Sequence, residues 1–124
     1  MTGLDWLGFS LAAAVGAPLR YLVDLRVGPK FGTGLPWGIL VVNLSGSLLF
    51  GLIAGLAIYH GLPNAPVVIL GTGFCGSFTT FSTFMWDTLK YAEGRDGGKA
   101  VGNVALTLIA CAAAASAGLG IAAF

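Results

Sequence analysis

The sequence predicts an all-helical membrane protein with four transmembrane helices, the third of them broken within the membrane. Hydrophobic residues make up 56% of the chain and charged residues only 9%, whereas a soluble domain carries roughly 25% charged residues. Apolar stretches recur at a length near the roughly 20 residues that cross a bilayer. One stretch contains the polar, glycine-rich segment GFCGSFTTFSTF at residues 73–84, which predicts the break.

We expect one transmembrane domain over residues 1–124, with helices at about residues 6–23, 37–59, 67–86 and 100–124. The first helix is the weakest, because Pro18 and Arg20 interrupt its second half. The second is unambiguous. The connectors are short and rich in glycine, proline or charge, so consecutive helices should form hairpins.

Small residues recur at four-residue spacing in the second and fourth helices, and this spacing lets two helix backbones approach closely. We therefore expect close packing through faces that contain Ser47, Gly51 and Gly55 in one helix and Ala110, Ala114 and Gly118 in the other.

The middle of the third stretch is a poor helix former. It combines glycines with the β-branched Thr79 and Thr80. An unwound turn would free backbone groups, and irregular backbone survives at membrane depth only where it is buried in protein or lines a polar cavity. Freed carbonyls suit a small cation, whereas freed amides, hydroxyls and a carboxamide suit a small anion.

The phenylalanines of this segment allow two interpretations. Phe81 and Phe84 are three residues apart and lie near one another on a helix face, with two hydroxyl residues between them. Aromatic rings present a positive edge, which suits an anion. Yet Phe74, Phe78, Phe81 and Met85 also follow the spacing of an ordinary packed helix, so both a core and a site remain open.

Charge and side-chain chemistry exclude several functions. The net charge is +1 and the basic residues are spread over the connectors, so a nucleic-acid partner is not expected. One histidine and two isolated cysteines provide no catalytic or metal set, so we do not expect an enzyme. No deep membrane carboxylate is present, which argues against a proton-coupled exporter. Neutral donors such as Asn43 favour an anion pore, although they could also simply join helices at about 1 kcal/mol each.

Three motifs carry a resemblance that covers the whole chain: GAPLRY at residues 16–21, GILVVNLSGS at 38–47 and GFCGSFTTFSTF at 73–84. They resemble the Fluc (CrcB) family of fluoride channels. The resemblance implies a passive, fluoride-selective channel of the cell membrane that exports cytoplasmic fluoride. It also implies a dimer of two antiparallel subunits with two pores and a structural sodium ion at its centre. The alternative is a small four-helix antiparallel transporter of another small solute.

The resemblance also implies residue roles. The fluoride pore would contain Phe81, Phe84, Asn43, Ser82, Thr83 and Thr107. The sodium ion would be held by the backbone carbonyls of Gly76 and Thr79, and the vestibular or structural positions would be Arg20 and Asp87. Two departures stand out. Ile39 lies where the family often has a threonine, and the fourth helix carries the stripe Asn103, Thr107 and Cys111 where hydroxyl or tyrosine side chains are usual.

The charge distribution raises the question of the partner subunit. All six Lys and Arg residues lie in or beside the connectors after the first and third helices. The positive-inside rule then favours both termini outside. An antiparallel homodimer instead needs each chain to insert in both orientations, so the partner is either a second copy or a paired homologue of opposite bias.

Overall fold

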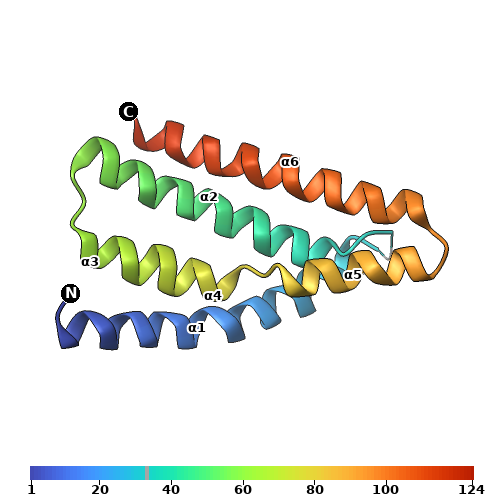
Figure 1. Ribbon diagram of the computed structural model, residues 1–124, viewed down its shortest axis with the longest axis horizontal. Coiled ribbons are helices and arrows are strands. Elements are labelled where there is room, and N and C mark those ends of the chain that lie inside the picture. The colour runs from blue at the N-terminus through green and yellow to red at the C-terminus, as the bar shows by residue number, and fades with distance from the viewer. Residues whose placement is uncertain (33) are drawn as a thin grey trace.

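The computed structural model describes residues 1–32 and 34–124, and it consists of helices that run back and forth along one long axis (Figure 1). Its elements in chain order are α1 (Gly3–Val27), the short turn η1 (Gly28–Lys30), α2 (Trp37–His60), α3 (Asn64–Pro66), the π-helix η2 (Val67–Cys75), α4 (Gly76–Phe78), α5 (Ser82–Glu93) and α6 (Gly97–Ala122). Four stretches are long and apolar enough to cross a membrane, which confirms the predicted number: Gly3–Lys30, Trp37–His60, Asn64–Glu93 and Gly97–Ala122.

α1 begins earlier and ends later than the sequence pattern suggests. Its N-terminus is closed by a reciprocal capping box between Thr2 and Asp5, in which each side chain accepts from the other residue's backbone N–H. Pro18 lies inside the helix without ending it. Neighbouring helices and local adjustments allow membrane helices to accommodate proline, so the expected weak point at Pro18 does not divide the first helix.

α2 and α6 pack most closely, and glycines make this approach possible. A side chain on Gly51 would collide with the Ala115 carbonyl, and one on Gly118 would collide with the Leu48 carbonyl. The prediction of close packing between the second and fourth helices is therefore confirmed at these glycines. At the far end of the pair, His60 Nε2 donates to the Ala122 carbonyl at 2.7 Å and joins the ends of the two helices.

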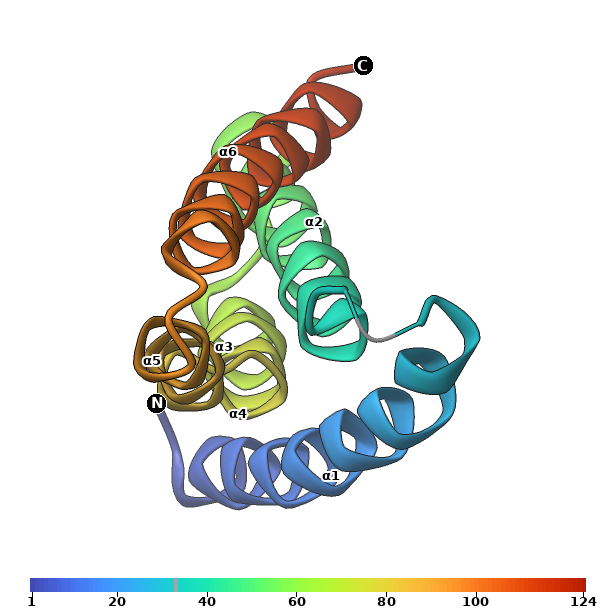
Figure 2. The ribbon, with the colours of Figure 1, turned by 90° about the vertical axis from the view of Figure 1, so that its right-hand side faces the viewer.

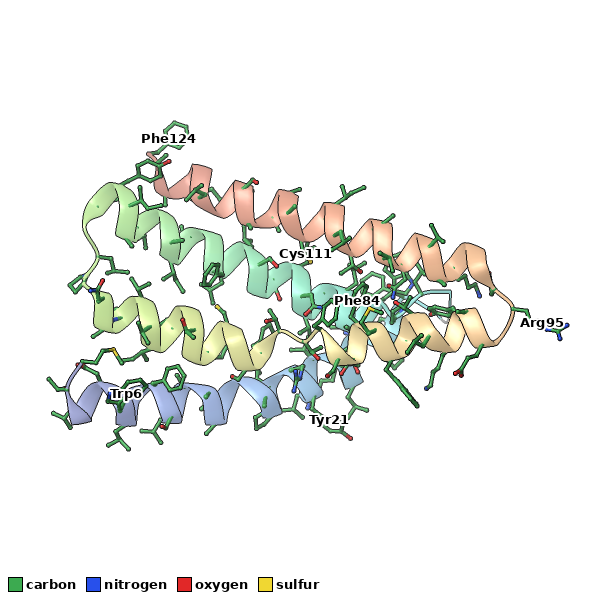
Figure 3. The ribbon with its side chains drawn as sticks, in the orientation of Figure 1. Trp6, Tyr21, Phe84, Arg95, Cys111 and Phe124 are labelled. Carbon is green, nitrogen blue, oxygen red and sulfur yellow. The ribbon has the colours of Figure 1, made fainter. Side chains whose placement is uncertain are left out.

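Seen from one end, α1 and α6 lie on opposite sides, with α2 and the α3–α5 stretch between them (Figure 2). α2 contacts α6 on one side and α1 and η2 on the other, so it is the central helix. Both termini lie at one end of the long axis, and the α5–α6 turn lies at the opposite end with Arg95 at its tip (Figures 1 and 3). Near that turn, Lys90 lies over the Trp86 ring and Lys99 over the Tyr91 ring.

The backbone conformation changes three times along the third crossing stretch. The π-helix η2 leads into α4, which ends at Phe78. Thr79 is extended, with φ −75° and ψ 160°, and α5 begins only at Ser82. Figure 1 shows this non-helical link between α4 and α5. The hydrogen-bond ladder does not run through the link, so the rotation of α5 about its axis is set by tertiary contacts.

We expect Gly118→Val to destabilise the protein by about 1–3 kcal/mol, since overpacking a close contact costs that much and the new side chain would meet the Leu48 carbonyl. Thermal unfolding in detergent measures the change. The matched control is Gly120→Val, because a side chain at Gly120 meets nothing within 4 Å. Equal stability of the two variants would contradict the close α2–α6 contact.

Candidate functional site

Asn43 on α2 holds the interruption between α4 and α5. Its Nδ2 donates to the Thr80 carbonyl at 3.0 Å, and the Thr80 N–H donates back to Asn43 Oδ1 at 2.8 Å. Both residues are buried. In a continuous α-helix the Thr80 N–H would bond to the Gly76 carbonyl, and the Thr80 carbonyl would accept from the Phe84 N–H. One carboxamide therefore replaces two backbone hydrogen bonds.

The Thr80 hydroxyl closes the first turn of α5. The Thr83 N–H donates to Thr80 Oγ1 at 3.2 Å, and Thr80 Oγ1 donates to Thr83 Oγ1 at 3.3 Å. Thr80 thus satisfies one of the N–H groups that a helix start leaves free, as capping residues do. The residue is missing from the predicted site. Its position three residues before Thr83, at the start of a helix, is the signal that would have found it.

Arg20 supplies a third contact to the interruption. Its Nη1 donates to the Thr79 carbonyl at 3.1 Å, and the bond is partly buried. Arg20 lies on α1 and Asn43 on α2, so two different helices hold consecutive residues of the non-helical link. Arg20 therefore makes a structural contact directly with the non-helical link.

Phe81 and Phe84 lie side by side but differ in exposure. Their ring centroids are 5.7 Å apart with an interplanar angle of 59°. Phe84 is 4% exposed and Phe81 is 71% exposed. Phe78 is buried and stacks on Phe74 at 5.5 Å. The core interpretation therefore holds for Phe74 and Phe78, whereas Phe81 points away from the core of this chain.

The start of α5 is rich in hydrogen-bond donors. Within residues 1–32 and 34–124, the backbone N–H groups of Phe81, Ser82 and Phe84 have no hydrogen-bond acceptor. The N-terminus of a helix also carries a partial positive charge from the aligned peptide dipoles. The exposed Ser82 and the half-buried Thr83 add hydroxyls at the same place. This end of α5 favours an anion.

Gly76 and Thr79, the predicted cation ligands, line an open hollow of about 470 Å³ together with Gly46 and Ser47 of α2. The Gly76 carbonyl lacks its helical partner because the Thr80 N–H bonds to Asn43. The Thr79 carbonyl accepts from Arg20 and keeps a second lone pair. Carbonyl oxygens are suitable ligands for an alkali cation, so the two residues fit such an ion.

Thr107 and Asp87 are the least connected of the predicted residues. Thr107 is buried on α6 and Asp87 is half-buried on α5. In the part of the chain that the structure describes, neither side chain makes a hydrogen bond, so they stay separate from the contacts around Thr80. Asn103, one turn before Thr107, instead bonds to Thr88 of α5 at 2.9 Å. Cys111 is a half-buried free thiol on α6 (Figure 3).

Four helical stretches long and apolar enough to cross a membrane define a small helical membrane protein. The model of the CrcB-like (camphor resistance) family matches residues 7–119. The chain belongs to this family, as the sequence motifs predicted. It is therefore a multi-pass protein of the cell membrane.

Curated relatives match over almost their full length. Fluoride-specific ion channel FluC 1 of Frankia casuarinae is 43% identical, over 96% of this chain and 96% of the relative. Fluoride-specific ion channel FluC 2 of Mycobacterium tuberculosis is 39% identical, over 98% of this chain and 94% of the relative. Fluoride-specific ion channel FluC 2 of Cutibacterium acnes is 43% identical, over 96% of both chains.

We expect Asn43→Ala to lower the free energy of unfolding by about 1–3 kcal/mol for each buried Thr80 backbone group that it leaves unpaired. Thermal unfolding in detergent again measures the loss. Ser45→Ala is the control on the same helix, because the Ser45 hydroxyl only bonds back to carbonyls of its own helix. The holding role of Asn43 is wrong if its variant is as stable as the control.

Proposed function

We propose that this chain forms a fluoride-selective, passive channel that exports cytoplasmic fluoride. The observation that carries the proposal is the start of α5, where unpaired N–H groups and hydroxyls lie beside the Phe81–Phe84 pair. The names of the relatives, each a fluoride-specific ion channel, support the same ligand.

Neutral donors suit conduction better than a fixed charge. A pore must bind its ion strongly enough to admit it and weakly enough to release it. Each hydrogen bond to a charged partner contributes about 1.5–3 kcal/mol, so several donors from Ser82, Thr83 and the backbone can replace part of the water shell. The positive edges of Phe81 and Phe84 add a weaker attraction. Thr107 and the remaining N–H of Asn43 would extend this track.

The third transmembrane helix is broken within the membrane in this proposal. The non-helical residues Thr79–Phe81 lie inside the crossing stretch Asn64–Glu93. Their backbone would be costly against lipid. Asn43 and Arg20 provide partners for part of it, and the passing anion would interact with the N–H groups that remain.

The pathway is incomplete in a single chain, which supports a dimer. Phe81 is largely exposed, and the hollow beside Gly76 and Thr79 is open. A second subunit in antiparallel orientation would cover both. Two-fold symmetry, exact or approximate, would then give two equivalent pores.

The proposed channel also holds a central sodium ion between the two subunits. The carbonyls of Gly76 and Thr79 from both subunits would hold it, since both residues line the hollow. When bound, the cation would offset the repulsion between carbonyl dipoles and join the two interrupted helices. Asp87 and Arg20 would lie toward the vestibules, with Arg20 also keeping its bond to Thr79.

We expect purified protein in liposomes to release fluoride passively and much faster than chloride. The double variant Phe81→Ile with Phe84→Ile should lose this flux, because isoleucine has the bulk but no aromatic edge. Phe124→Ile is the control, since Phe124 is fully exposed at the C-terminus. A fluoride electrode measures the efflux. Retained flux in the double variant would refute the pore assignment, and equal chloride flux would refute selectivity.

We expect a reporter fused to the C-terminus of this chain, expressed alone, to lie mainly outside the cell, because the basic residues gather at the opposite end. Paired fusions that are active only inside or only outside measure the two populations. A one-sided result assigns the partner to a paired homologue. Equal populations would instead assign it to a second copy of the chain.

A further inference from the structure

A buried polar chain connects α6 to the backbone of Phe84. Asn103 Nδ2 donates to Thr88 Oγ1 at 2.9 Å, and Thr88 Oγ1 donates to the Phe84 carbonyl at 2.9 Å. Asn103 is 2% exposed, and Thr88 is also buried. Figure 3 labels Phe84 near the start of α5, just after the link from α4. The three residues thus join the first turns of α5 to α6.

The donor and the acceptor of each hydrogen bond between Asn103, Thr88 and Phe84 are fixed. A hydroxyl has one hydrogen, and Thr88 uses it on the Phe84 carbonyl. Thr88 can therefore only accept from Asn103, which fixes the carboxamide with its NH₂ group toward α5. A buried polar group is costly unless it is hydrogen-bonded, so the pair favours one rotation of α5 against α6 and disfavours others.

α5 needs such a constraint because it does not inherit its rotation from α4. The helical ladder stops at Phe78 and restarts at Ser82. Among the residues that the structure describes, the bond from Asn103 to Thr88 is the only side-chain hydrogen bond between α5 and α6. A shift of one residue turns a helix by about 100°, which would move Phe84 away from its buried place beside Phe81.

We infer that Asn103 is a positioning residue for the anion pathway, acting through Thr88 on the turn that carries Phe84. The inference rests on the proposed channel function. It separates Asn103 from Thr107, one turn along the same helix, whose hydroxyl bonds to no group in the described part of the chain. Asn103 holds the pathway in place through one N–H of its NH₂ group, which it donates to Thr88.

A matched set of variants separates positioning from helix adhesion. Thr88→Val leaves the buried Asn103 carboxamide without its partner, and Asn103→Leu removes the bond that Thr88 Oγ1 accepts while the hydroxyl still donates to the Phe84 carbonyl. The double variant replaces both side chains by apolar groups and can be nearly neutral for stability. Thr88→Ser keeps the hydroxyl. Ser116→Ala is the control on α6, because its hydroxyl bonds only to its own helix. Each protein is measured for thermal stability, fluoride efflux and the ratio of fluoride to chloride flux.

We expect the double variant to be more stable than Thr88→Val, because it no longer buries an unpaired carboxamide. It should still conduct fluoride about tenfold more slowly than the unsubstituted protein, as loss of one well-formed hydrogen bond allows, and with a lower fluoride-to-chloride ratio. Thr88→Ser should behave like the unsubstituted protein. A double variant with unchanged flux and ratio would overturn the inference and leave only adhesion. If the double variant does not fold, Thr88→Ser provides the test. A loss of fluoride flux in Thr88→Ser as large as that in Thr88→Val would overturn the role of the hydroxyl.

The two proposals fail in different ways. Liposomes with the unsubstituted protein that release no fluoride reject the channel and, with it, this role for Asn103. Liposomes that release fluoride at the same rate and ratio with every variant support the channel and reject the positioning role alone.

Discussion

The exchange of two hydrogen bonds between the Asn43 carboxamide and the Thr80 backbone is the constraint on which the rest of the structure depends. A helix interrupted in a bilayer leaves amides and carbonyls that lipid cannot satisfy. Asn43 satisfies one of each at the same residue, and it does so from the central helix α2. Without this clamp the buried N–H and carbonyl of Thr80 would both lose their partners, at a cost of about 1–3 kcal/mol each.

Close helix packing makes the clamp possible. A side chain on Gly46 would collide with Thr79, and one on Gly16 would collide with Ser77. These two glycines let α2 and α1 approach the backbone next to the interruption, so that short side chains can reach it. The same approach brings the Arg20 guanidinium to the Thr79 carbonyl. The polar contacts to the interruption therefore depend on the absence of a side chain at these two glycines.

The interruption leaves hydrogen-bond acceptors at the end of α4 and hydrogen-bond donors at the start of α5. The end of α4 releases carbonyl oxygens at Gly76 and Thr79, whereas the start of α5 releases N–H groups around Ser82. Gly76 and Thr79 line an open hollow beside α2, and the N–H groups lie beside the phenylalanine pair. Carbonyl acceptors and N–H donors thus lie only a few residues apart in one interruption.

The sequence by itself determined the four crossing helices, the family and the composition of the donor-rich segment, because hydrophobic length and motif content are local properties of the chain. It left open whether Phe81 belonged to the core, and only the tertiary structure placed it outward with Phe84 inward. The partner of Asn43 and the buried link from Asn103 were likewise decided by folding. Asn43 and Thr80 are 37 residues apart, and a hydrogen bond at that separation depends on how the helices rotate against one another, which no local pattern encodes.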